Sequence, residues 1–129
     1  MAMRFIVKGR PASVQSSTPN KAGWSAMVAA AAGPKCPEPL TSNDLRIKVT
    51  FYYNVLPDFD SDNISKPICD ALNGIAYRDD HQLADRIVKR RDMGKPYVFR
   101  GIDPELAVAI AEGEEFVYVE IDDANLGEL

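Results

Sequence analysis

The feature that most constrains the fold is a strict alternation of apolar side chains over residues 45–53, "LRIKVTFYY". Successive side chains of a β-strand point to opposite faces of its sheet, so apolar residues at every second position share one face. Here the residues on that face are Leu45, Ile47, Val49, Phe51 and Tyr53. The segment is therefore predicted to be a strand with one face in a hydrophobic core.

Two more strands are predicted near the ends of the sequence. Residues 3–8 alternate, with Phe5 and Val7 on one face, and residues 115–121, "EFVYVEI", are rich in β-branched and aromatic residues. Residues 82–91, "QLADRIVKRR", remain ambiguous. The spacing of Leu83 and Ile87 suits a helix there, whereas the alternation around Val88 suits a strand.

Three helices are predicted between these strands. Residues 21–32, "KAGWSAMVAAAA", are rich in alanine and are followed by Gly33-Pro34, which ends a helix. A second helix is expected from 103 onward in "DPELAVAIAEG", with Asp103 as its N-cap and Pro104 in its first turn. The apolar face of the 21–32 helix, with Trp24 and Met27, suits the core better than a dimer interface.

The third helix is predicted over residues 63–73, within "ISKPICDALNG". Asp62 or Asn63 is the expected N-cap and Gly74 the terminating residue. Pro67 lies early in this helix, where a missing N–H costs little.

These elements alternate along the chain, which indicates an α+β (α/β-like) fold. At 129 residues, with 46% apolar and 26% charged residues, the chain matches one globular domain that buries a core. We therefore predict a single domain over residues 1–129, with a mixed sheet of about four strands and helices packed on it. Residues 122–129 are expected to be a frayed tail.

Composition also excludes several classes of protein. No apolar run is long enough to span a membrane, and the N-terminus lacks the pattern of a signal peptide. Cys36 and Cys69 are the only cysteines, which suggests a reduced, cytoplasmic protein without a disulfide framework. His81 is the only histidine, so a His-based zinc site is not expected within one chain.

Charge is distributed unevenly along the sequence. The net charge is −4, but nine acidic residues and no Lys or Arg lie from Asp103 onward, which leaves a balance of +5 in residues 1–102. The densest basic run is "RIVKRRDMGK", residues 86–95. Local potential steers a polyanion more than total charge does, so this run is either a solvated face or a polyanion-binding surface.

An acidic cluster follows the central strand in "LPDFDSDNISK", residues 56–66. A calcium-binding EF-hand loop starting at Asp58 would need Gly at its sixth position and Glu at its twelfth. Asn63 and Cys69 occupy those positions, and Lys66 occupies a ligand position, so this interpretation is disfavoured. A simple turn with a helix cap is an alternative, but it leaves the concentration of carboxylates unexplained.

A magnesium site is the remaining interpretation. Asp60 and Asp62 are two residues apart on an extended segment and point to the same side. A helix over 63–73 followed by a short return can bring Asp80 beside them. Three carboxylates suit Mg²⁺, and Lys66 lies one helical turn beyond Asp62, within reach of the same pocket. Such a site is suited to phosphodiester hydrolysis.

The same region resembles the signature of a known family, the RusA family of Holliday-junction resolvases. The run "DSDNISKPICDALNGIAYRDDHQL" fills each fixed position of that signature. Those positions are Asp60, Asp62, Asn63, Lys66, Asp70, Ala71, Leu72, Asp79, Asp80 and Gln82. The N-terminal "GRPASVQ" is similar to the G-x-P-x-S-x-Q segment common in the family.

This resemblance implies a specific activity. Members of the family are small homodimeric, Mg²⁺-dependent endonucleases, often encoded in prophages, that nick two opposed strands of a four-way DNA junction. A two-fold dimer matches such a two-fold substrate. The implied role in the cell is DNA recombination and repair.

The resemblance also implies roles for individual residues. The metal-binding catalytic acids would be Asp60, Asp62 and Asp80, and Lys66 would be the catalytic lysine. The supporting residues would be Asn63, Asp70 and Asp79. Candidate contacts to DNA phosphates are Arg10, Lys21, Arg86, Lys89, Arg90 and Arg91. Asp58 is an additional carboxylate, expected in a solvated loop, and the acidic C-terminal segment is expected to lie away from the DNA.

Two other functions remain open at this point. The chain could be a DNA-junction-binding protein of the same fold without cleavage activity. It could also be a metal-dependent phosphohydrolase that acts on a smaller substrate and needs neither a dimer nor the basic run.

Overall fold

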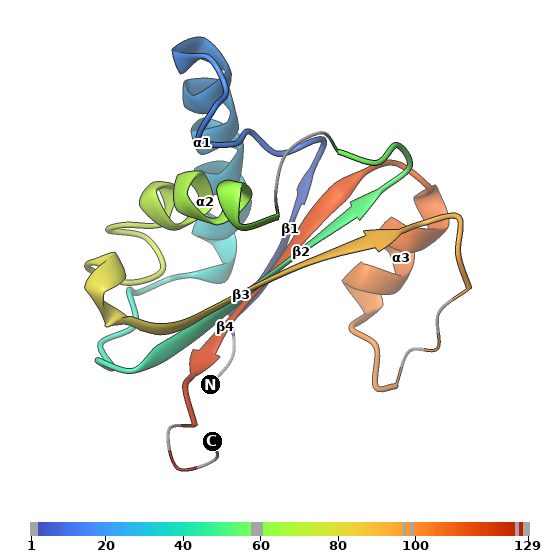
Figure 1. Ribbon diagram of the computed structural model, residues 1–129. Coiled ribbons are helices and arrows are strands. Elements are labelled where there is room, and N and C mark those ends of the chain that lie inside the picture. The colour runs from blue at the N-terminus through green and yellow to red at the C-terminus, as the bar shows by residue number, and fades with distance from the viewer. Residues whose placement is uncertain (1–2, 58–60, 97, 99, 126, 128–129) are drawn as a thin grey trace.

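A computed structural model describes residues 3–57, 61–96, 98, 100–125 and 127, with backbone alone for residues 61 and 62 (Figure 1). Its strands are β1 (Met3–Lys8), β2 (Leu45–Tyr53), β3 (Leu83–Asp92) and β4 (Phe116–Asp123). Its α-helices are α1 (Thr18–Ala32), α2 (Ser65–Ala71) and α3 (Pro104–Glu112). Three short 3₁₀ turns are η1 (Gly33–Lys35), η2 (Ser61–Ile64) and η3 (Asp80–Gln82).

The four strands form one mixed sheet in the order β1-β4-β2-β3. Strand β4 pairs antiparallel with both β1 and β2, whereas β2 and β3 run parallel. A parallel neighbour needs a crossover, and α2 supplies it between β2 and β3. The expected α+β domain with about four strands is confirmed.

Each face of the sheet is covered by helix. Helices α1 and α2 lie on one face and α3 lies on the other (Figure 1). The larger core lies under α1 and α2 and contains the predicted face of β2, from Leu45 to Phe51, with Tyr53 packed against it. The smaller core lies under α3, where Tyr52, Phe116 and Tyr118 pack on Leu106 and Ala109.

The ambiguous segment is a strand. Strand β3 pairs with β2 along its length and lies at the edge of the sheet. One extra residue, Ala84, interrupts the register because Leu45 pairs with Leu83 whereas Arg46 pairs with Asp85. This β-bulge lets Leu83 and Val88, an odd number of residues apart, pack against the same core.

Helix α1 begins at Thr18, three residues before the predicted start. The Ser17 side chain caps it by accepting a hydrogen bond from the N–H of Asn20, and a proline follows in the first turn. Trp24 is buried in the core, but Met27 is 47% exposed, so only part of the predicted apolar face is covered.

The prediction for α2 was wrong at both ends. Ile64, rather than Asp62 or Asn63, is its N-cap, because the chain first forms the η2 turn. The aliphatic side chain of Ile64 has no acceptor for a capping hydrogen bond. The helix ends at Ala71, before Gly74. Gly74 has φ +80°, which favours glycine, in the turn that reverses the chain.

The last helix and strand follow the predicted order. Asp103 caps α3 by accepting from the N–H of Glu105 at 3.3 Å, as expected. Strand β4 continues through Asp123, two residues into the segment that was expected to be frayed, and the N–H of Ala124 donates to the carbonyl of Asp44 at 2.8 Å. Within the described residues, no helix combines the length and apolar character needed to cross a membrane.

Candidate active site

The chain reversal between α2 and β3 is held by a buried tyrosine. Tyr77 is fully buried, and its hydroxyl donates to the carbonyl of Cys69 in α2 at 2.7 Å. Burial is the main cause that raises the pKa of this phenol, so it stays protonated and keeps donating. The N–H of Gly74 donates to the carbonyl of Tyr77 at 2.8 Å and closes the turn. The reversal therefore leads the chain directly from α2 to the acidic pair Asp79-Asp80.

Gln82 fixes the backbone around that acidic pair. Its carbonyl oxygen accepts from the N–H groups of Arg78 and Asp79, at 2.9 and 3.1 Å. Its amide group donates to the carbonyls of Leu40 and Ser42, at 2.8 and 2.9 Å. The first pair of hydrogen bonds holds the reversal together and the second pair joins it to a separate loop, which explains why a buried polar side chain is stable at this position.

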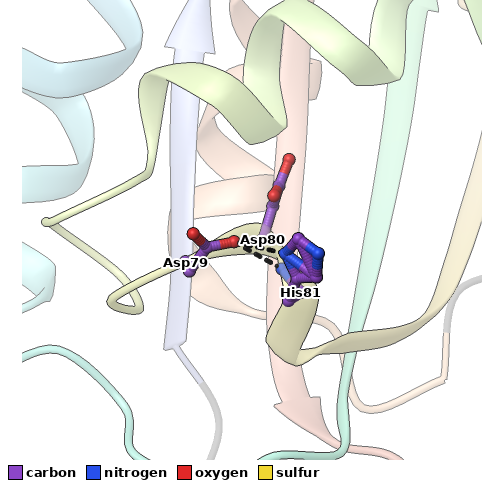
Figure 2. Close-up of side chains that lie close together, drawn as sticks. All are labelled: Asp79, Asp80 and His81. Atoms are coloured by element: carbon purple, nitrogen blue, oxygen red, sulfur yellow. Dashed lines mark hydrogen bonds and ion pairs between the residues drawn. The ribbon is translucent and has the colours of Figure 1, made fainter.

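Asp80 lies at the start of η3, beside α2. Its side chain is 26% exposed, and one oxygen lies 3.6 Å from a guanidinium nitrogen of Arg86. Figure 2 shows the Asp80 carboxylate pointing away from its two neighbours, Asp79 and His81. Burial raises the pKa of the Cys69 thiol in α2. The charge of Arg86 lowers this pKa and the charge of Asp80 raises it, so Asp80 interacts electrostatically with a residue of α2. Asp80 is thus a half-buried carboxylate facing the crossover helix.

Asp79 is the N-cap of the η3 turn. Its carboxylate accepts from the N–H of His81 at 2.9 Å and completes a capping box with Gln82. The hydrogen bond from that N–H is the main cause that lowers the pKa of Asp79. Asp79, Asp80 and His81 offer ligand atoms within 4.8 Å of one another, so these described residues have the donors to hold a metal ion.

The other acidic residues of the predicted site fall partly outside the described part of the chain. Asp58 and Asp60 lie outside the described residues, and Asp62 is described in its backbone alone, within η2. The structure therefore leaves the convergence of Asp60, Asp62 and Asp80 as a prediction. Asn63 is placed through its backbone, since its carbonyl accepts from the N–H of Val14 at 3.0 Å.

Lys66 lies in the first turn of α2, on the side that faces α1. Its ammonium pairs with Asp70, one turn along the helix, at 3.0 Å, and 67% of its side chain is exposed. Lys66 and Asp70 line an open groove of about 550 Å³ between α1 and α2, together with Lys21. The two predicted cations Lys21 and Lys66 therefore share one surface beside the crossover helix.

The basic run on β3 does not form a single surface. Arg86 and Arg90 are each two residues from Val88 on β3, so all three side chains share one face of the strand. Val88 packs on the core under α2, which places Arg86 and Arg90 on the α2 face of the sheet. Lys89 and Arg91 lie on the α3 face, since Arg91 pairs with Tyr52 of the smaller core. The candidate DNA contacts are thus divided between two faces.

Arg10, also a candidate DNA contact, has internal partners. Its guanidinium forms an ion pair with Glu115 at 3.1 Å and donates to the carbonyl of Val55 at 2.7 Å. It also lies over the ring of Phe51, 5.7 Å from the centroid.

Two acidic residues of α3 form ion pairs with lysines that lie outside α2. On α3, Glu112 pairs with Lys8 and Glu105 pairs with Lys35. The described acidic residues of α3 therefore belong to the helix on the other face of the sheet from α2 (Figure 1).

Two residues of structural importance were not assigned a role from sequence. Gln82 was recognised as a motif position, but its hydrogen bonds join segments 40 residues apart, which no local pattern reveals. Glu115 had no sequence signal, because its partners Arg10 and Asn54 come from the ends of two other strands.

Comparisons with known proteins bear on the family of this chain. No curated protein was found to match the chain significantly. The family model described as "Endodeoxyribonuclease RusA" matches residues 6–110, which include α1, α2, the acidic motif and the Asp79-Asp80 pair. On this match over most of its length, the chain belongs to the RusA family of endodeoxyribonucleases.

Proposed function

We propose that the protein is a Mg²⁺-dependent endonuclease that resolves four-way DNA junctions by paired symmetric nicks. The observation that carries this proposal is the position of Asp80. A buried reversal sets its half-buried carboxylate beside α2, whose preceding turn contains Asp62. Membership of a nuclease family supplies the class of reaction.

The residues fit a hard divalent cation. Asp60, Asp62 and Asp80 would hold Mg²⁺ through carboxylate oxygens, the donors this ion prefers. When bound, the ion supplies a Lewis acid for the phosphate and a more acidic water. Lys66, which is exposed and whose ammonium pairs with Asp70 one helical turn away, would exchange Asp70 for a phosphate oxygen of DNA.

The proposed partner is a DNA four-way junction bound by a homodimer. One site cuts one strand, and two sites related by a two-fold axis match the symmetry of the junction. Arg86 and Arg90 lie on the same face of the sheet as Asp80, so this face is the proposed DNA surface. Lys21 extends it along the groove beside α2.

The test is cleavage of a synthetic junction in Mg²⁺ by the wild type, compared with a linear duplex of the same sequence. We expect Asp60→Asn to lose cleavage by at least about 100-fold while junction binding persists, since the loss of a metal ligand removes transition-state stabilisation. Asp85→Asn is the matched control. It removes a carboxylate from β3 that is bonded to Arg46 on the neighbouring strand, and we expect cleavage to remain.

Each alternative predicts a different result in this assay. Wild-type cleavage by Asp60→Asn would contradict the site. Junction binding without cleavage by the wild type would instead identify a non-catalytic binding protein. Equal rates on junction and linear DNA, or hydrolysis of small phosphodiesters alone, would identify a phosphohydrolase without selectivity for junctions.

A further inference from the structure

Glu115 joins three separate segments at the end of the sheet where β2 finishes. Its carboxylate accepts from the N–H groups of Asn54 and Val55, at 2.7 and 3.2 Å. It also accepts two hydrogen bonds from Arg10, at 3.2 and 3.1 Å. Four donors therefore converge on one side chain, which is only 18% exposed.

The charged form of Glu115 is strongly favoured by these partners. Burial alone would raise the pKa of its carboxyl, but the hydrogen bonds from Asn54, Val55 and Arg10 outweigh it and hold the pKa below its usual value. The carboxylate of Glu115, the residue before β4, thus satisfies the backbone N–H groups of Asn54 and Val55.

The segment after β2 is tied down at several further points. The Asn54 side chain donates to the carbonyl of Gly113 at 2.9 Å, and the carbonyl of Val55 accepts from Arg10 at 2.7 Å. Pro57, the next residue but one, is buried. The backbone next to Arg10 is also fixed to Glu115, because the N–H of Gly9 donates to the Glu115 carbonyl at 2.8 Å.

Hydrophobic burial holds this segment at Pro57 but not at the residues before it. The side chains of Val55 and Leu56 are 67% and 61% exposed, so they contribute little to holding the backbone. The polar contacts of Glu115 and Arg10 therefore hold the backbone of residues 54 and 55, ahead of the buried Pro57. In the sequence this segment lies just before the acidic motif, which begins with Asp60.

We propose that Glu115 is a positioning residue for the nuclease site, which acts with Arg10 by fixing the backbone of residues 54 and 55, shortly before the acidic motif in the sequence. This proposal rests on the proposed function for the identity of the site. In this proposal Glu115 acts through the backbone of residues 54 and 55 rather than by contact with DNA, and it lies beyond residues 6–110, the part that the family model matches.

The test compares Glu115→Gln with Glu112→Gln. Glu112 is a matched control because it also pairs with a β1 cation, Lys8, but it does not contact the segment after β2. Two readouts do not depend on cleavage: hydrogen exchange of the Asn54 and Val55 amides in metal-free protein, and the Mg²⁺ concentration at half of the metal-induced rise in Tm. Cleavage of a junction supplies kcat and KM as a third readout.

For Glu115→Gln we expect about tenfold faster exchange of both amides, a Mg²⁺ midpoint at least about threefold higher, and a lower kcat with an unchanged KM. Glu112→Gln should match the wild type in all three. Where Glu115→Gln fails to fold, Arg10→Gln removes the two hydrogen bonds between Arg10 and Glu115, together with the one to the Val55 carbonyl, and should give the same shifts in amide exchange and in the Mg²⁺ midpoint.

Unchanged exchange, or an unchanged Mg²⁺ midpoint despite faster exchange, would overturn the positioning role. A purely structural role would lower Tm without moving the midpoint or kcat. Failure of the wild type to cut junctions would contradict the proposed function instead, while the exchange rates and the Mg²⁺ midpoint would still decide the role of Glu115.

Discussion

The Tyr77→Phe substitution tests the reversal that leads to Asp80. It removes the hydroxyl that donates to the Cys69 carbonyl at 2.7 Å and keeps the buried ring. The carbonyl keeps a weaker hydrogen bond from the N–H of Leu72 at 3.3 Å, so it is not left entirely unsatisfied. The expected cost is therefore that of one net hydrogen bond, about 1 kcal/mol of the free energy of unfolding.

This cost corresponds to a measurable change in melting temperature. For a chain of 129 residues, the entropy of unfolding is about 0.27 kcal/mol/K at a specific value of roughly 2.1 cal/mol/K per residue. A loss of about 1 kcal/mol then lowers Tm by about 4 °C. The amides of residues 72–79 should also exchange faster in the variant, because the hydroxyl ties their turn to α2.

Urea denaturation and hydrogen exchange together check this prediction. Tyr118→Phe is the matched control, since its hydroxyl donates to Asp103 at 3.2 Å on the α3 face and is less buried. The control should lose less stability and leave exchange at residues 72–79 unchanged. A Tyr77→Phe variant as stable as the wild type, with unchanged exchange in the turn, would refute the role given to this hydrogen bond.

Three further predictions follow from the contacts. Gln82→Ala should lower the free energy of unfolding by about 2–4 kcal/mol in urea denaturation, because it leaves two N–H groups and two carbonyls without partners; a loss under about 0.5 kcal/mol would contradict this. The pKa of Glu115 is lower in the folded state than its unfolded value near 4.5, so the charged carboxylate stabilises the fold at pH values above 4.5. The difference in free energy of unfolding between the wild type and Glu115→Gln should therefore shrink as the pH falls through the folded pKa. A difference that stays constant from pH 6 to pH 3 would contradict this prediction. Arg90→Ala should reduce the salt dependence of junction binding by about one unit of slope, whereas Arg91→Ala, on the α3 face, should leave it unchanged; equal effects would contradict the assignment of the DNA face.

Sequence reasoning predicted the elements where one local pattern was strong. The alternation from Leu45 to Tyr53 predicted β2 because the apolar residues at every second position lie on one face of the strand and enter the larger core. The 82–91 segment stayed ambiguous for a physical reason, the bulge at Ala84. It shifts the alternation by one residue, so that Leu83 and Val88 reach the same core despite an odd spacing.

The candidate site was predictable to the extent that its residues are close in sequence. The motif from Asn63 to Gln82 includes the helix, the turn and the acidic pair, and the predicted reversal after Gly74 is present. What local spacing does not reveal are the contacts that cross the fold. Glu115 meets Arg10 and Asn54 only after β4 has inserted between β1 and β2.

The α2 cap shows a limit of motif-based prediction. Asn63 has the chemistry of an N-cap, but the chain forms the η2 turn before the helix, and Ile64 takes the cap position. Ile64 is buried in the core, so the gain from burying its side chain offsets the missing cap.

Calorimetric titration with Mg²⁺ tests most directly whether two separate segments share one metal site. The wild type, Asp60→Asn and Asp80→Asn are compared in the absence of DNA, with Asp85→Asn as the control. We predict that Asp60→Asn and Asp80→Asn each weaken the same binding event by at least about tenfold, as expected when one of a few carboxylate ligands is lost, and that Asp85→Asn binds like the wild type. Wild-type Mg²⁺ affinity in Asp80→Asn, together with lost binding in Asp60→Asn, would contradict a site shared between the two segments.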